Sequence, residues 1–141
     1  MIWFLRHGDA EDGDDDFARE LTEKGERQSR AAGKALAALG VELDACLTSP
    51  RVRAAQTAEL ACAALVIEPE EAQELSGGDF DPEALAAGRG NVLLVGHEPD
   101  FSRAVGDLTG ARIEMKKGGL AAVEGATLVA LLRPAQIKRI A

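Results

Sequence analysis

Short apolar runs alternate along the chain with segments whose apolar residues recur at helical spacing. Residues 2–5 (Ile-Trp-Phe-Leu) and residues 91–95, which contain Val-Leu-Leu-Val, are continuous runs of this kind. Such runs are typical of strands that are covered on both faces of a sheet. Residues 43–48 predict another buried strand, and residues 65–68 predict a short strand after it.

Helix signals follow several of these runs. Thr22 is a suitable N-cap for a helix that we expect to end near Leu39, with Gly40 as its stop. Ser49 and Pro50 mark a second helix start, because proline is favoured at the first helical position after an N-cap. We expect this second helix to run to about residue 64. The apolar stripe of the first helix consists of Ala32, Ala35, Leu36 and Leu39.

Two shorter helices and a hairpin complete the pattern. Residues 82–87 predict a short helix, and Pro99 opens another. Residues 120–123 and 127–132 are close enough to pair as a hairpin. Strands that alternate with helices predict a three-layer α/β sandwich, with a mostly parallel central sheet flanked by helices. The length of 141 residues suits a single domain, residues 1–141.

Composition narrows the possible functions. Apolar residues make up 46% of the chain and charged residues 28%, an ordinary balance for a soluble globular protein. The net charge of −8 disfavours nucleic acid and anionic membranes as partners. No apolar stretch approaches the roughly 20 residues that a membrane-spanning helix needs. Cys46 and Cys62 lack metal-ligand spacing, so we expect two free thiols and a cytoplasmic protein. The acidic run at residues 11–16 is expected to be a solvated loop.

The only two histidines each follow a predicted strand. His7 lies in an Arg-His-Gly sequence after the first strand, and His97 lies in a Gly-His-Glu sequence after the Val-Leu-Leu-Val strand. Ligands of open α/β sheets bind at the carboxyl ends of the strands. Arg53, at the start of the helix after the second strand, faces the same edge. We therefore expect Arg6, His7, Arg53 and His97 to share one cleft.

The start of the second helix also favours an anion. Arg51 and Arg53 place two cations at the positive end of the helix dipole, which costs about a few tenths of a kcal/mol each. An anion bound at that terminus would explain these residues. Together with the two histidines, they favour a phosphate site.

Four sequence blocks, in this order, resemble the histidine phosphatase superfamily. The blocks are Arg6-His7-Gly8, Leu21-Thr22-x-x-Gly25-x-x-Gln28, Ser49-Pro50-x-x-Arg53-Ala54-x-Gln56-Thr57-Ala58 and Gly96-His97. The Arg-His-Gly-Asp-Ala opening and the short length are most similar to the SixA branch, the phosphohistidine phosphatases. The resemblance covers essentially the whole chain and implies a phosphoglycerate mutase-like fold.

The resemblance implies a metal-independent phosphatase that needs no cofactor. His7 would be the nucleophile that forms a phosphohistidine intermediate, and Arg6, Arg53 and His97 would surround the phosphoryl oxygens. Guanidinium groups match these oxygens in geometry and charge. His7 must be neutral to attack, whereas a protonated His97 would serve best as the stabiliser of charge, and the bound dianion would favour that form.

A carboxylic acid that protonates the leaving group has no clear match in the sequence. Asp9, Glu74 and Asp79 are the candidates for this proton donor. Imidazole is easier to expel than an alkoxide, so the lack of an evident acid favours a phosphohistidine substrate. The connection at residues 65–90 is too short for a lid, and an open cleft suits phosphohistidine on a partner protein.

Three alternatives stand beside this interpretation. The same mechanism would serve a small phosphomonoester substrate. The fold would also suit a non-catalytic module that binds phosphoproteins, although all four reactive residues are present. A metal-dependent phosphoesterase is disfavoured, because its site would require more ligands than two histidines and scattered acids provide.

Overall fold

The computed structural model describes residues 1–141 and is built around one six-stranded mixed sheet. The strand order is β3-β2-β4-β1-β5-β6. β1 is parallel to β4, β4 to β2, and β2 to β3, whereas β5 is antiparallel to both β1 and β6. The predicted mostly parallel sheet with a C-terminal hairpin is confirmed. The strands are β1 (Ile2–Arg6), β2 (Ala45–Thr48), β3 (Pro69–Glu71), β4 (Val92–Gly96), β5 (Leu120–Glu124) and β6 (Thr127–Leu132).

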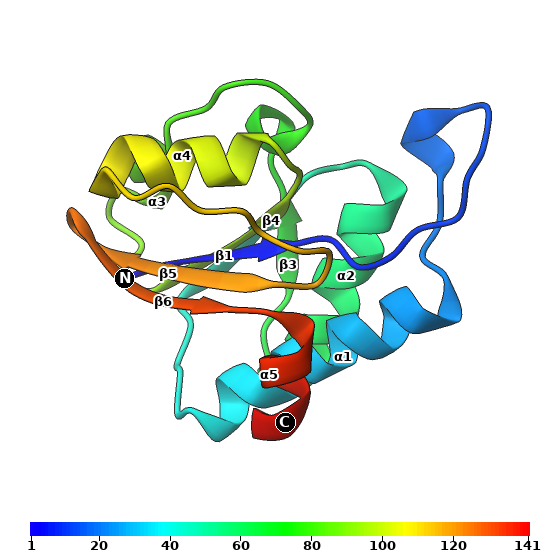
Figure 1. Ribbon diagram of the computed structural model, residues 1–141, viewed down its shortest axis with the longest axis horizontal. Coiled ribbons are helices and arrows are strands. Elements are labelled where there is room, and N and C mark those ends of the chain that lie inside the picture. The colour runs from blue at the N-terminus through cyan, green and yellow to red at the C-terminus, as the bar shows by residue number, and fades with distance from the viewer.

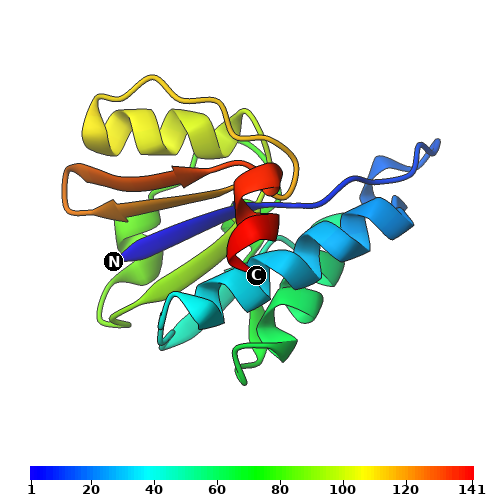
Figure 2. The ribbon, with the colours of Figure 1, turned by 60° about the horizontal axis from the view of Figure 1, so that its bottom comes forward.

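Helices cover both faces of the sheet and complete the three layers. One face carries α1, α2 and α5, and the other carries α3 and α4 (Figures 1 and 2). The α-helices are α1 (Glu23–Ala38), α2 (Val52–Ala63), α3 (Pro82–Ala86), α4 (Asp100–Thr109) and α5 (Pro134–Ile140). Two 3-10 turns, η1 (Asp16–Ala18) and η2 (Gln73–Leu75), lie in the connections.

The alternation of side chains along the central strands divides the core into two clusters. On β1, Trp3 and Leu5 join the cluster under α1, α2 and α5, and Phe4 joins the cluster under α4. The Phe4 ring meets Phe101 of α4 edge to face, with centroids 5.3 Å apart. Because β4 is buried along its whole length, the strand that precedes His97 is held rigidly from both sides.

The predicted strand at residues 65–68 is wrong, and the third strand lies a few residues later, in β3. Val66 has a positive φ of 53° and is 96% exposed, a conformation that no strand residue adopts. Leu65 and Ile67 nevertheless pack partly against the core. The apolar pattern of these residues therefore indicates burial and not strand pairing.

Three details of the predicted helices also differ. Leu39 is 49% exposed, because it caps the end of α1 rather than continuing its buried stripe. α2 begins at Val52 instead of Pro50, with Arg51 as its N-cap. The Ser49 hydroxyl accepts a hydrogen bond from the Arg51 backbone N–H (3.2 Å), so Ser49 forms a turn ahead of the helix. α5 was not predicted, since Ile137 is the only buried residue of its short, polar sequence.

A close approach of two backbone segments fixes the loop after β1. A Cβ atom at Gly8 would lie 2.6 Å from the Gly25 carbonyl oxygen, and one at Gly25 would collide with the Asp9 carbonyl. Thr22 caps α1 as predicted, accepting a hydrogen bond from the Gly25 N–H at 3.0 Å. The two glycines therefore let the loop that carries His7 rest directly on the first turn of α1.

Candidate active site

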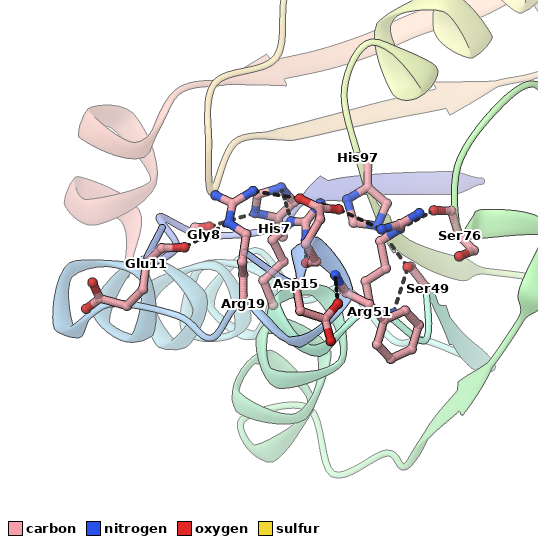
Figure 3. A network of polar contacts seen from close by, with 12 residues as sticks. His7, Gly8, Glu11, Asp15, Arg19, Ser49, Arg51, Ser76 and His97 are labelled. Atoms are coloured by element: carbon pink, nitrogen blue, oxygen red, sulfur yellow. Dashed lines mark hydrogen bonds and ion pairs between the residues drawn. The ribbon is translucent and has the colours of Figure 1, made fainter. Parts of the chain in front are cut away.

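The structure brings the four predicted residues to one edge of the sheet. β1, β4 and β2 are parallel neighbours, so the residues that follow them meet at their carboxyl ends. The ring centroids of His7 and His97 are 5.2 Å apart, and each histidine is only 6% exposed. Arg53, from the first turn of α2, is 7% exposed. Figure 3 shows His7 and His97 side by side, with Ser49 and Arg51 beside them.

Hydrogen bonds define which ring nitrogen of His7 carries the proton. His7 Nδ1 lies 2.7 Å from the Gly8 carbonyl oxygen, which can only accept, so Nδ1 carries the proton. Arg53 Nε donates to His7 Nε2 at 3.3 Å, so Nε2 presents its lone pair. Burial lowers the pKa of His7 to about 4, against the opposing effect of the Gly8 hydrogen bond, and the charges of Arg53 and Arg6 lower it further. At neutral pH, His7 is therefore a neutral imidazole whose unprotonated Nε2 accepts a hydrogen bond from Arg53.

His97 is neutral as well in the site without a bound anion, so the protonated form expected with a bound dianion stays a prediction. Burial lowers its pKa to about 3, and the neighbouring His7, Arg53 and Arg51 act in the same direction. Its Nε2 lies 2.8 Å from the Ser49 hydroxyl, and its Nδ1 is buried without a partner. The Ser49 hydroxyl already accepts from a backbone N–H, so its own proton can go to Nε2, which leaves Nδ1 as an N–H donor.

Arg6 approaches the same site from the end of β1. One terminal nitrogen, Nη1, donates to the Met115 carbonyl at 2.9 Å, whereas Nε is buried without a partner. A buried N–H group without an acceptor is costly, by about 1–3 kcal/mol. Arg6 Nε and His97 Nδ1 are thus two buried nitrogens without a hydrogen-bond partner in the site.

Thr57 connects the loop that carries His7 to the helix that carries Arg53. Its hydroxyl accepts from the Gly8 N–H at 3.1 Å and donates to the Arg53 carbonyl at 2.7 Å. Gln28 supports the same loop from α1, because its side-chain oxygen accepts from the Asp9 N–H at 2.9 Å. These contacts hold the backbone on which His7 and Arg53 are mounted, and they explain part of the spacing in the sequence blocks.

Asp16 is the site residue that sequence reasoning missed, since the acidic run at 11–16 is not merely a solvated loop. Its carboxylate contacts Arg51 Nη1 at 2.6 Å and Arg53 Nη2 at 3.3 Å through one oxygen, and Arg19 Nη1 at 3.0 Å through the other. The Asp16 carbonyl also accepts from Arg53 Nη1 at 2.8 Å. The hydrogen bond from Arg19 lowers the pKa of Asp16 most, and the charges of Arg53 and Arg51 lower it further, so the carboxylate is ionised.

No hydrogen bond or ion pair joins the three predicted proton donors to Arg6, His7, Arg53 or His97. Asp9 accepts from the Thr22 hydroxyl at 2.9 Å and pairs with Lys117 at 3.4 Å, and the Thr22 hydrogen bond is the main reason why its pKa is lowered. Glu74 lies exposed in η2, and Asp79 pairs with Arg103 at 3.1 Å on the surface. Asp9 is thus engaged in positioning the start of α1.

No group of three or more His, Cys, Asp or Glu side chains is arranged to hold a metal ion. No helix combines the length and the apolar character that crossing a membrane requires.

A neutral histidine, a second histidine and two arginines thus lie together at the carboxyl end of a parallel sheet, an arrangement that could hold a phosphoryl group. A model of the histidine phosphatase superfamily (branch 1) matches residues 2–84, which include Arg6, His7 and Arg53. The chain therefore belongs to the histidine phosphatase superfamily, and this membership supports phosphatase activity. His97 lies beyond the matched residues, and the tertiary structure places it beside His7.

The chain matches one curated relative over most of that protein's length and another over a minor part. An uncharacterized protein of Picosynechococcus sp. is 37% identical over 135 residues, which cover 84% of this chain and 81% of that protein. The mitochondrial serine/threonine-protein phosphatase Pgam5 of Drosophila melanogaster is 32% identical over 119 residues, 80% of this chain. The match covers only 37% of Pgam5.

Among solved structures, the protein histidine phosphatase SixA complexed with tungstate superimposes with a TM-score of 0.84 at 27% identity. The match covers 97% of this chain and 99% of that one. The fold is phosphoglycerate mutase-like, as the sequence resemblance implied, and the SixA proteins are among its most similar structures.

Proposed function

We propose that this protein hydrolyses phosphohistidine on a partner protein, through a phosphohistidine intermediate on His7. The observation that carries the proposal is the state of His7: a neutral ring whose Nδ1–H is held by the Gly8 carbonyl and whose Nε2 faces Arg53. A nucleophile needs such a lone pair, and a protonated histidine lacks it.

In the first step, the Nε2 lone pair attacks phosphorus, and the P–N bond to the substrate imidazole breaks. The leaving imidazole departs as a neutral ring when its other nitrogen already carries a proton. In the second step, a water oxygen attacks phosphorus and the P–Nε2 bond breaks. Both water protons stay with the dihydrogen phosphate product, and His7 returns to its neutral form.

The donors around His7 suit the charge that develops on the phosphoryl oxygens. Arg6 Nε and His97 Nδ1 are buried without acceptors, and the Arg53 guanidinium, which now donates to His7 and Asp16, lies beside the Nε2 nitrogen. Phosphoryl transfer depends mainly on such positioning and charge stabilisation. A neutral His97 serves as a hydrogen-bond donor in this scheme, and a bound dianion would raise its affinity for a second proton.

The similarity to SixA, named a protein histidine phosphatase, supports a protein-borne phosphohistidine as the substrate. The short elements between α2 and β4, namely β3, η2 and α3, also support an open site. The similarity to Pgam5, named a serine/threonine-protein phosphatase, favours a phosphomonoester as the second candidate. Catalysis without a metal and a cytoplasmic location are part of the proposal, and the buried free thiols of Cys46 and Cys62 fit a reducing compartment.

The test compares kcat/KM on a phosphohistidine peptide, an aryl phosphate and an alkyl phosphate, with one enzyme preparation near neutral pH. We expect the phosphohistidine peptide to be the best substrate and the alkyl phosphate the poorest. A higher kcat/KM on the alkyl phosphate would transfer the proposal to phosphomonoesters. If the wild type turned over none of the three while binding phosphate, the non-catalytic module would take its place.

A further inference from the structure

The arginines of the site already have an internal anionic partner. Asp16 approaches Arg51 and Arg53 with one carboxylate oxygen and Arg19 with the other. Arg51 is held in addition by the Ser76 carbonyl, which accepts from its Nε at 2.6 Å, and Figure 3 shows Arg51 reaching toward Ser76. Asp16 thus forms ion pairs with Arg51 and Arg53, the arginines that would also bind a phosphoryl group.

The contacts of Arg53 conflict with phosphoryl binding. All three of its guanidinium nitrogens are engaged: Nε with His7 Nε2, Nη1 with the Asp16 carbonyl, and Nη2 with the Asp16 carboxylate. A phosphoryl group that bonds to His7 Nε2 must take the place where Arg53 Nε now donates. The guanidinium therefore has to exchange partners before it can hold phosphoryl oxygens.

The segment that carries Asp16 packs loosely against the rest of the protein. η1 buries no residue, and Phe17 beside Asp16 is 46% exposed. The base of the loop is closed by an isolated bridge between Ala10 and Leu21, so its tip is held mainly by polar contacts. Segments with few buried apolar contacts open at low free-energy cost.

We propose that Asp16 is an exchangeable anion, which holds Arg51 and Arg53 in the empty site, yields them to the phosphoryl group, and recovers them as phosphate leaves. Asp16 would thereby compete with the product and limit its inhibition of turnover. This inference takes only the position of the phosphoryl group, at His7 Nε2, from the proposed function. The exchange itself can be measured with inorganic phosphate.

The first experiment measures the dissociation constant of inorganic phosphate for the wild type and three variants, by calorimetry at fixed ionic strength. Asp16→Asn removes the competing charge, so we expect phosphate to bind about tenfold more tightly, the scale of one charge-assisted contact at a partly exposed site. Asp14→Asn is the matched control, because Asp14 is exposed in the same segment and takes part in none of its ion pairs. We expect its affinity to stay within about twofold of wild type, the scale of an exposed charge. Asp16→Glu keeps the charge and should remain near wild type.

Weaker phosphate binding in Asp16→Asn would overturn the exchange and leave Asp16 as a positioning partner of Arg53. Equal changes in the Asp14 and Asp16 variants would overturn it too, since the effect would then come from net charge.

The second experiment needs no variant and guards against a misfolded one. Saturating inorganic phosphate should speed hydrogen exchange at the backbone amides of residues 16–19 in the wild type, because Asp16 loses its arginine partners. Unchanged or slower exchange in these residues would reject the release of Asp16. Failure of the phosphohistidine assay with faster exchange here would reject the substrate and leave the exchangeable anion standing.

Discussion

Arg53 allows charge and geometry to be separated in one experiment. Arg53→Lys keeps a positive charge near His7 but replaces three hydrogen-bonding nitrogens by one, and Arg53→Ala removes both. In the structure the guanidinium contacts His7 and Asp16 through separate nitrogens, which a single ammonium cannot reproduce. Loss of one preorganised donor of this type lowers the rate by about 10²- to 10³-fold. We expect a fall of this size in kcat/KM for Arg53→Lys, and a fall at least as large for Arg53→Ala.

The pH dependence supplies the second half of this prediction. The charge of Arg53 is one cause of the lowered pKa of His7, which is about 4. His7 loses its lone pair below its pKa, so kcat/KM of the wild type should fall only as pH drops toward 4. Arg53→Lys should keep this acid limb in place, whereas Arg53→Ala should move it toward the ordinary histidine pKa of about 6.5.

The assay is kcat/KM on an aryl phosphate between pH 4 and 8, because phosphohistidine itself is labile in acid. Ionisation of the substrate is the same for every variant, so differences between the curves report the enzyme. Arg30→Lys is the control, since Arg30 lies exposed on α1 in an ion pair with Glu26. Activity of Arg53→Lys within about threefold of wild type, far below the loss expected for a missing donor, would refute the role of the guanidinium fork. Identical acid limbs in the Lys and Ala variants would refute the electrostatic argument.

Three further outcomes are expected. His7→Ala should abolish turnover and the acid-labile phosphate that can be trapped on the wild type, and near-normal activity would exclude His7 as the nucleophile. Exhaustive chelation should leave turnover unchanged; a loss that added divalent metal restores would favour a metallophosphatase. The free energy of unfolding should fall as pH drops below about 6.5. Histidines of the unfolded chain bind protons in this range, whereas buried His7 and His97 bind them only near their lowered pKa values of about 4 and about 3. Between pH 7 and pH 5, the free energy of unfolding should therefore fall less in His97→Asn than in the wild type, with a difference of up to about 2 kcal/mol. Denaturant titrations at the two pH values measure this difference. Equal losses would contradict the lowered pKa of His97.

Much of the frame of the site was predictable from local sequence. The apolar runs before His7 and His97 reported strands buried on both faces, and parallel strands end at a common edge. The Thr22 cap and the hairpin at the C-terminus were equally local signals, and the structure confirms both. The prediction of a strand at residues 65–68 was wrong, because Leu65 and Ile67 are partly buried without joining the sheet.

The chemistry of the site was decided by the tertiary structure. The strand pattern shows that His7 and His97 share an edge, but their neutral state comes from burial and from arginines that arrive on other elements. The sequence could not single out Asp16 from the acidic run. Asp16 differs from Asp14 only in its ion pairs with three arginines, and the fold alone brings these arginines close. Local sequence carries the periodicity that specifies strands and helices, whereas pKa values and ion pairs depend on distances between residues that only the folded chain sets.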